Sequence, residues 1–422
     1  MAVKKARARV PYRGATHYRH LPRALRRQLE KERLVLVLSG GAPNSPLAAG
    51  ALYALQEDMV DGAGRQFDAI YTAGAGALIG LLFVAPRHGD PKRALLDIVN
   101  VGIADPIYRM VPFDYKIFRK AGPFTELFLE WADVFKDRAA EMPRFRKWVT
   151  TWLEAWGGPS RARRPRADTE RDDPERRLFD DWVDLVFTAM APTTLTPRST
   201  GLCDPLPFLD DLVDFRALRT KYRGAFYVNV WDLTRNRATQ FTKAHLDAAE
   251  VRAALAFPFI YPPGHIKGRH YAEGAGHHPL SFPRVEIEGQ DPASPPISCD
   301  PRSGGLVPPP QIVYIDVLGD LSRQLIRRPR DLWDAYGLSM ITPIVALARS
   351  DLRAFKKVVN NEAFCGAYRL LELGFPEIPR DVGSHLLDWN YSNLCTMWDI
   401  GYEAGKKFWK ENARTLVPPR ES

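Results

Sequence analysis

The sequence predicts an α/β fold in three layers, with helices on both faces of a mainly parallel central sheet and one helical insertion. Three observations support this prediction. Two units of apolar strand, glycine turn and apolar helix follow one another at 34–55 and 67–84. Strand-like and helix-like segments alternate again over 208–318, after a helix-rich stretch at about 100–200. Such alternation is typical of parallel sheets covered by helices.

The first unit begins with Leu-Val-Leu-Val-Leu at 34–38, an unbroken run of β-favouring apolar residues. Such a run predicts a strand that is buried on both faces of a parallel sheet. Residues 47–55 are rich in Ala and Leu, and they predict a helix. Ser45 is interpreted as the N-cap of this helix, with Pro46 at its first position.

The second unit repeats the arrangement. Residues 67–72 predict a short strand, and 77–84 predict an apolar helix. Small residues at 73–76 form the turn between them. Together the two units predict neighbouring strands whose carboxyl ends both lead into glycine-containing turns.

The insertion at about 100–200 contains helical stretches at 124–135 and 145–156, followed by a segment at 160–177 that is dense in charges of both signs. That segment predicts an exposed loop. The aromatic residues of the insertion are interpreted either as a cover over a ligand pocket or as ordinary core: Tyr108, Phe113, Phe118, Phe124, Phe128 and Trp131.

The later segments are predicted, in order, as helix, strand, helix, strand, loop and strand at 208–218, 225–231, 248–255, 269–272, 289–310 and 311–318. Helical patterns follow at 321–359, interrupted by prolines, and at 386–409. We therefore expect three parts: a basic arm at 1–33, an α/β domain at 34–320, and a helical region at 321–422 that packs on the domain.

The charge of the chain is concentrated in the arm. Residues 1–33 contain eleven lysines and arginines and two glutamates, an excess that equals the formal charge of +9 of the whole chain. A basic arm on a neutral body favours an anionic partner, such as a membrane surface, although a solvated tail has the same composition. The arm contains no recognised nucleic-acid-binding motif, so nucleic acid is disfavoured as the partner.

Several classes of protein are disfavoured by composition. No apolar run reaches the roughly 18–20 residues that a membrane span needs, and the arm has no apolar core of a secretory signal. The four cysteines are widely spaced and form no pattern typical of a metal site or a disulfide framework. A cytoplasmic location, with peripheral membrane contact through the arm, fits these features best.

Three segments carry the pattern of a catalytic site. The first is Ser-Gly-Gly-Ala-Pro-Asn-Ser at 39–45, a turn in which backbone N–H groups and a helix N-terminus could converge on an oxyanion. The second is Thr-Ala-Gly-Ala-Gly at 72–76, small residues between a strand and an apolar helix. The third is Gly-Arg-His-Tyr-Ala-Glu-Gly-Ala at 268–275, which follows Phe-Tyr-Val-Asn-Val-Trp-Asp-Leu-Thr at 226–234 and a proline-rich segment at 253–263.

In this order, the segments resemble the motifs of patatin-like acyl hydrolases: a glycine-rich oxyanion loop, a G-x-S-x-G nucleophile elbow and an Asp-Gly segment that completes a Ser-Asp dyad. The resemblance covers residues 34 to about 280. It implies the three-layer fold of that family and a lipid or acyl-ester ligand. The sequence itself contains no signature of a nucleotide, a metal ion or an organic cofactor.

The resemblance assigns the oxyanion loop to Gly40, Gly41 and Ala42. It assigns the elbow to Thr72, Ala73, Gly74, Ala75 and Gly76. The position of the nucleophilic serine then falls on Gly74, or on Ala73 if the register shifts by one, and neither residue has a hydroxyl. Glu273 takes the place of the dyad Asp, and the usual basic residue of the oxyanion loop is Asn44.

Three functions are compatible with these substitutions. The favoured one is lipid or acyl-ester handling by a patatin-like protein whose hydrolase activity is lost or strongly altered. The second is an active acyl hydrolase with a displaced nucleophile, either Ser45 or Thr72, for which His277 beside Glu273 would supply a base. The third is a non-catalytic lipid-binding scaffold at an anionic membrane surface.

Overall fold

The computed structural model describes residues 33–159, 165–167, 173–204, 206, 208–283, 310–319, 328–329, 332–357, 360, 368–376 and 388–417. Apart from their end residues, the basic arm expected at 1–33 and the loop expected at 289–310 lie outside the described residues.

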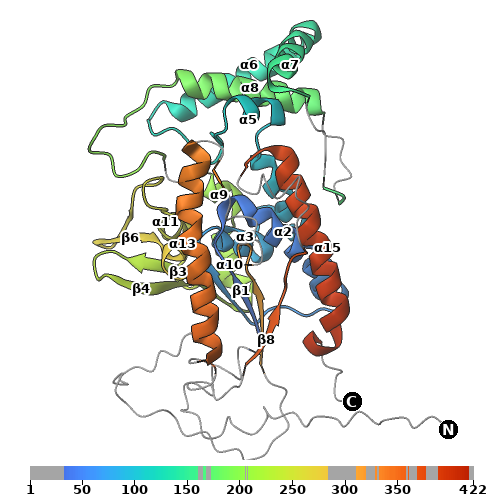
Figure 1. The fold of residues 1–422 in the computed structure, drawn as a ribbon, viewed down its shortest axis with the longest axis vertical. Coiled ribbons are helices and arrows are strands. Elements are labelled where there is room, and N and C mark those ends of the chain that lie inside the picture. Colours follow the sequence, from blue (N-terminus) through green and yellow to red (C-terminus); the bar gives the residue numbers. More distant parts are fainter. Residues whose placement is uncertain are drawn as a thin grey trace, which may run out of the picture.

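The described residues form one sheet of eight strands (Figure 1). Its centre is parallel and has the order β3-β2-β1-β7-β8. β4 and β6 pair antiparallel with β3, and β5 pairs antiparallel with β6. The strands are β1 (Leu34–Leu38), β2 (Ala69–Ala73), β3 (Ala225–Asp232), β4 (Arg237–Thr242), β5 (Gly264–Ile266), β6 (Arg269–Glu273), β7 (Gln311–Ile315) and β8 (Arg369–Glu372). This mostly parallel sheet with its helices confirms the predicted α/β fold.

The helices fall into the sheet-covering set and the insertion. The first set is α2 (Ser45–Leu55), α3 (Ala75–Val84), α4 (Pro91–Asp97), α9 (Leu209–Leu212), α10 (Phe215–Thr220), α11 (Ala248–Ala254), α13 (Leu332–Ala354) and α15 (Tyr391–Leu416). The insertion contains α5 (Asp105–Met110), α6 (Thr125–Ala140), α7 (Pro143–Gly157) and α8 (Pro174–Met190). Short turns of other helical types are η2 (Ala42–Asn44), η3 (Gln56–Gly62), η4 (Ile98–Val101) and η5 (Gly274–Gly276). None of the described helices is both long and apolar enough to cross a membrane.

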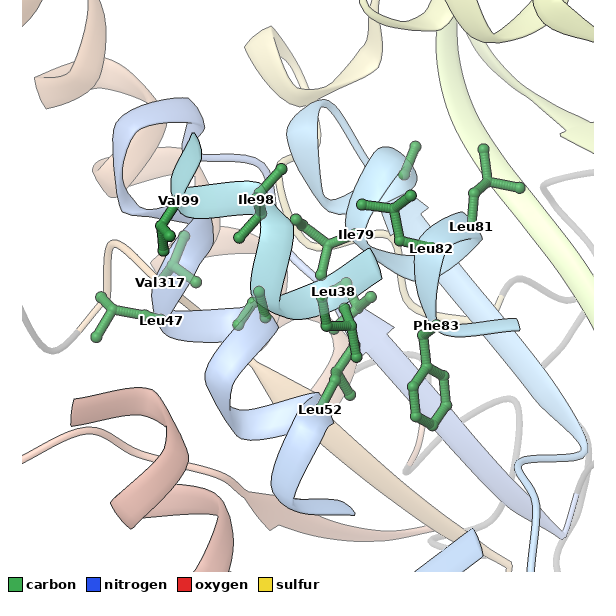
Figure 2. Packing of buried hydrophobic residues seen from close by; sticks show 14 of the residues in the cluster. Leu38, Leu47, Leu52, Ile79, Leu81, Leu82, Phe83, Ile98, Val99 and Val317 are labelled. Atoms are coloured by element: carbon green, nitrogen blue, oxygen red, sulfur yellow. The ribbon is translucent and has the colours of Figure 1, made fainter. Parts of the chain in front are cut away.

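Strand β1 is buried on both of its faces, as its composition predicts. Its leucines belong to a large core that also contains side chains of α2, α3 and η4, and Figure 2 shows Leu38, Leu52 and Ile79 in that core. Its valines belong to a second core on the opposite face, together with Phe282 and Phe355. Because side chains alternate between the two faces of a strand, the leucines of β1 pack into the core on one side of the sheet and its valines into the core on the other.

Helix α15 packs closely on α2. A Cβ atom on Gly401 of α15 would overlap the carbonyl oxygen of Leu47, and one on Gly50 of α2 would overlap that of Trp398. Glycine on both helices therefore allows the two backbones to approach each other. The indole N–H of Trp398 also donates a hydrogen bond to the carbonyl of Leu95, at 3.0 Å.

The insertion forms a helical cap at one end of the molecule, where α6, α7 and α8 lie together beyond α5 (Figure 1). Aromatic contacts join the three cap helices. The ring centroids of Phe135 in α6 and Phe187 in α8 lie 6.0 Å apart, and those of Phe145 in α7 and Phe179 in α8 lie 6.1 Å apart. The hydroxyl of Tyr115, in the segment after α5, donates to the carbonyl of Asp181 in α8. The cap is thus anchored to the part of the insertion that adjoins the sheet.

Candidate functional site

Gly74 lies at the sharp turn between β2 and α3. Its φ of 49° and ψ of −135° place it in a region of backbone space that residues with a side chain rarely adopt. Its carbonyl accepts a hydrogen bond from the N–H of Ala77 at 2.8 Å, which closes the first turn of α3. The apex of the turn is therefore Gly74 rather than Ala73, which is still part of β2.

The start of α3 lies against the end of β1. A Cβ atom on Gly76 would lie 2.5 Å from the carbonyl oxygen of Ser39 and 2.9 Å from that of Leu38. Only glycine fits at this point, which explains the small residues that the sequence places after the turn.

The turn after β1 is built from Gly40 and Gly41. Gly41 has a φ of 149°, and a Cβ atom on it would lie 2.6 Å from the Cγ2 of Val317. A Cβ atom on Gly40 would lie 2.6 Å from the Cβ of Ala275, in the turn that follows β6. Ala42 is exposed and begins η2, which leads into α2. The turn after β1 thus packs against the turn after β6.

Glu273 ends β6, and its carboxylate brings the three segments together. Its N–H donates to the carbonyl of Ala256 at 3.0 Å, which fixes the backbone. A Cβ atom on Gly74 would overlap Oε1 of Glu273, and one on Gly40 would lie 3.7 Å from the same oxygen. The Glu273 carboxylate therefore occupies the space that a side chain at position 74 would need.

The surroundings of Glu273 favour its neutral form. Burial raises the pKa of the carboxyl group from 4.5 to about 8, because no charged partner offsets the loss of water. Among the described residues, no hydrogen bond or ion pair to the carboxylate is found. At neutral pH the group is therefore mostly a protonated acid, which can donate a hydrogen bond.

A cavity of about 230 Å³ opens beside these turns. Gly40, Gly41, Ala42, Ala75 and Glu273 line it where the turns of the site meet. The rest of the wall is mainly apolar and comes from α3, the insertion, α11 and its following loop, α13 and α15, with Leu78, Ile79, Phe118, Ile260, Ile344 and Leu394 as examples. A mainly apolar cavity that also holds a few polar groups, among them Glu273, Asp334 and Asp388, suits an acyl chain with a polar head.

A family model described as patatin-like phospholipase matches residues 36–282. The match covers more than half of the chain and includes all three turns of the site. The chain belongs to the patatin-like phospholipase family.

A similar solved structure is that of VipD from Legionella pneumophila. It is 15% identical, with a TM-score of 0.31, and the alignment covers 90% of this chain and 67% of VipD. No curated protein matches the chain significantly.

Within this patatin-like domain, the candidates for a displaced site are not all brought together. Ser45 and Glu273 both line the cavity, whereas His277 is exposed and stacks on Trp231, with ring centroids 3.8 Å apart. Although the His277 side chain is largely exposed, partial desolvation of its ring, and secondarily His278, lowers the pKa of His277. Thr72 is fully buried in β2 and donates its hydroxyl proton to the carbonyl of Tyr227 at 2.9 Å.

The start of α2 differs from the prediction. Asn44, not Ser45, is the N-cap residue, and Ser45 is the first residue of the helix. The interpretation of Ser45 as an N-cap is therefore wrong, because η2 runs into α2 without a break and shifts the cap by one residue. Asn44 is fully buried, and neither Nδ2 nor Oδ1 of its side-chain amide has a hydrogen-bond partner in the described part of the chain.

Asn229 supports the site and was not singled out by the sequence analysis. It lies in β3, and its Nδ2 donates to the carbonyls of Gly274 at 3.2 Å and His278 at 3.0 Å. These bonds hold the turn that follows Glu273. A polar residue in the middle of an otherwise apolar strand was the signal that could have found it.

The described residues contain no group of three His, Cys, Asp or Glu side chains placed to hold a metal ion. Cys203 and Cys395 are buried and free, and burial raises the pKa of each thiol to about 12. Neither thiol is poised as a nucleophile, because the thiolate form is suppressed at neutral pH.

Proposed function

We propose that this patatin-like protein binds the acyl chain of a lipid in its cavity and has lost the hydrolase activity of its family. In this proposal Gly74 holds the position of the nucleophile, and Glu273 holds that of the dyad acid. The loop of Gly40, Gly41 and Ala42 holds the position of the oxyanion hole.

The observation that carries the proposal is the location of the Glu273 carboxylate. It fills the room for a side chain at position 74, so the loss of the serine and the longer acid are spatially complementary. The apolar cavity beside them is retained. A site that keeps its ligand space while its nucleophile position is filled is suited to binding without turnover.

The protonation of Glu273 also argues against hydrolysis by activated water. A general base must be deprotonated when it meets its substrate, and burial keeps Glu273 mostly protonated at neutral pH. A protonated carboxyl group can instead donate a hydrogen bond to the carbonyl or carboxylate of a bound lipid. Glu273 would therefore orient the polar end of the ligand.

The proposal is tested by displacement of a fluorescent fatty acid, using oleate and monooleoylglycerol as competitors. We expect wild-type protein to bind, and Ile79→Trp to weaken binding by about tenfold or more because it fills the cavity. The control Leu233→Trp lies at an exposed position just after β3 that does not line the cavity. Equal binding by wild type and Ile79→Trp would contradict the assignment of the cavity as the lipid site.

A second candidate is an active hydrolase that uses Ser45. One observation favours it: Ser45 lies on the same cavity as Glu273. Release of fatty acid from p-nitrophenyl and phosphatidylcholine substrates by wild type and Ser45→Ala separates the candidates. If wild type releases fatty acid and Ser45→Ala does not, this second candidate replaces the first. Thr72→Ser serves as the control, because the hydroxyl at position 72 already donates a hydrogen bond to the carbonyl of Tyr227.

We further propose that the basic arm at 1–33 holds the protein at an anionic membrane surface in the cytoplasm. The arm contains eleven basic and only two acidic residues, and this excess of positive charge supports the proposal. Removal of the arm is expected to abolish the salt-sensitive part of binding to phosphatidylglycerol vesicles. Unchanged salt dependence after truncation would reject it.

A further inference from the structure

Helix α7 exposes a line of tryptophans. Trp148, Trp152 and Trp156 are spaced four residues apart, so their side chains lie along one side of the helix. Their exposed fractions are 66%, 47% and 73%, whereas Val149 and Leu153 on the other side are buried. The tryptophans are thus not part of the core.

Helix α6 carries a similar line. Four exposed apolar residues recur at intervals of three and four: the N-cap residue Phe124, and Leu127, Trp131 and Val134 within the helix. Ala132 and Ala139 face the protein instead.

Aromatic contacts beside the two lines join the two helices. The rings of Phe135 in α6 and Phe145 in α7 lie 6.5 Å apart, and those of Phe145 and Trp148 lie 6.3 Å apart. The four residues of the first line, from Phe124 to Val134, and the three tryptophans of α7 are called the cap face below. Figure 1 shows α6 and α7 at the end of the molecule that is farthest from the sheet. An exposed apolar surface of this extent marks an interaction site.

We propose that the cap face docks this protein on the surface of a phospholipid bilayer. Tryptophan has an apolar ring and a polar N–H, and it is enriched where membranes meet water. Arg144 and Lys147 are exposed on α7 beside the tryptophans, where they can reach lipid phosphates. The same two helices also expose acidic residues, among them Glu130, Asp137 and Glu154, so a zwitterionic bilayer fits better than a strongly anionic one.

The cap face is connected to the cavity through α5. The guanidinium of Arg109 in α5 donates to the carbonyl of Gly157, the last residue of α7, at 2.8 Å. A Cβ atom on Gly157 would overlap the carbonyl oxygen of Pro106, so α7 and α5 are in tight contact. Tyr108 of α5 lines the cavity. A bilayer bound at the cap face is therefore linked by one short helix to the wall of the lipid site.

The test is flotation of the full chain with vesicles of pure phosphatidylcholine. These vesicles have no net charge, so the basic arm contributes little to binding. We expect wild type to float with the vesicles. We expect Trp148→Ala/Trp152→Ala/Trp156→Ala to reduce the bound fraction by about tenfold or more, because apolar area is lost from the interface. The matched control Leu233→Ala removes an exposed apolar residue outside the cap and should bind as wild type does.

Two results would overturn the proposal. One is equal flotation of wild type and the triple variant. The other is failure of the wild type to float, together with a change of its oligomeric state in sedimentation when the tryptophans are replaced, which would make the cap face a contact between protein chains. Flotation reports docking and not uptake of lipid into the cavity, so the proposal does not rest on the proposed function. Because the three side chains are exposed, an unchanged circular dichroism melt verifies that the variant folds.

Discussion

At the residue scale, the site combines a turn suited to a nucleophile with an acid that blocks it. The backbone of Gly74 has a left-handed conformation, yet the Glu273 carboxylate lies where its side chain would be. A single Gly74→Ser substitution would therefore place its new side chain against Glu273. Shortening Glu273 to Asp would relieve that overlap, so we expect the two positions to be energetically coupled.

The raised pKa of Glu273 predicts how stability depends on pH. In the unfolded chain the carboxyl group loses its proton near its ordinary pKa of 4.5, whereas in the folded protein it keeps it up to about 8. The folded state thus binds more protons in this window, and its stability falls as pH rises from 4.5 to 8. Glu273→Gln should reduce this fall. At pH 9 it should be more stable than wild type by about 1–3 kcal/mol, a range set below the full conversion of the shift because the group is partly open to solvent.

Urea unfolding of both proteins at pH 5 and pH 9 measures this effect. Burial also raises the pKa of Asp114 to about 7, and burial together with Asp247 does the same for Glu250, so part of the fall remains in the variant. Glu130→Gln on the exposed side of α6 is the matched control. Parallel stability curves for wild type and Glu273→Gln would contradict the assigned ionisation.

Sequence reasoning located the turns of the site but not their contact. Gly40, Gly74 and Glu273 each lie in a short local pattern, and the turns that contain them follow directly from the strands before them. The position of the Glu273 carboxylate depends instead on how β6 pairs with β3 and on a side-chain rotamer. Neither can be read from a local pattern, so the overlap with position 74 became visible only in three dimensions.

At the element scale, the packing of α15 on α2 predicts a large effect at Gly401. Alanine is a better helix former than glycine, but the Cβ atom of an alanine at position 401 would overlap the carbonyl oxygen of Leu47. We expect Gly401→Ala to lower the free energy of unfolding by about 1–3 kcal/mol, because the helices must move apart. Denaturant unfolding at neutral pH measures the change.

Gly276→Ala is the matched control for this substitution. A Cβ atom at Gly276 would have no atom within 4 Å, and its φ is not in the left-handed region. Stability of this variant should stay within about 0.5 kcal/mol of wild type. If Gly401→Ala were equally neutral, the close approach of the two helices would be in doubt.

The strands that sequence reasoning missed are short or polar. β4, β5 and β8 have no counterpart in the prediction. β4 reads Arg-Ala-Thr-Gln-Phe-Thr and leaves no residue fully buried, and β5 has three residues. Central strands such as β1 can be predicted from unbroken apolar runs, whereas the formation of edge strands depends on pairing with a neighbouring strand. Pro343 lies inside α13 without ending it, so that proline did not mark a boundary there.

At the scale of the whole molecule, the cavity joins parts of the chain that lie far apart in the sequence. Its wall includes Ile79 of α3, Phe118 of the insertion, Ile344 of α13 and Leu394 of α15. A lipid bound there would contact all four and would bind only the folded protein. We therefore expect oleate at a hundred times its dissociation constant to stabilise wild type by about 2–3 kcal/mol.

Thermal unfolding with and without oleate measures this stabilisation. Ile79→Trp should lose most of it, and Leu233→Trp should keep it, because Leu233 is exposed and does not line the cavity. An equal rise of the melting temperature in all three proteins would indicate that oleate acts outside the cavity.

The overall architecture was accessible from the sequence because it depends on the order of local patterns. Two strand-turn-helix units, a helical insertion and returning strands predicted the mostly parallel sheet. The layout of the cap was not accessible, because the same aromatic residues could have faced the core, the cavity or solvent. Tyr108 and Phe118 line the cavity, whereas Phe124, just before α6, and Trp131, within it, are exposed.

The most direct test of the central claim compares ester hydrolysis by wild type, Gly74→Ser and Gly74→Ser/Glu273→Asp, using p-nitrophenyl butyrate and phosphatidylcholine. The account predicts background release by wild type and little or none by Gly74→Ser, whose new side chain meets Glu273. It predicts release at least about tenfold above background by the double variant, in which a hydroxyl and a shorter acid share the elbow. Clear turnover by wild type that is lost in Glu273→Gln would contradict the account, because it would require a working catalytic centre without a serine at position 74.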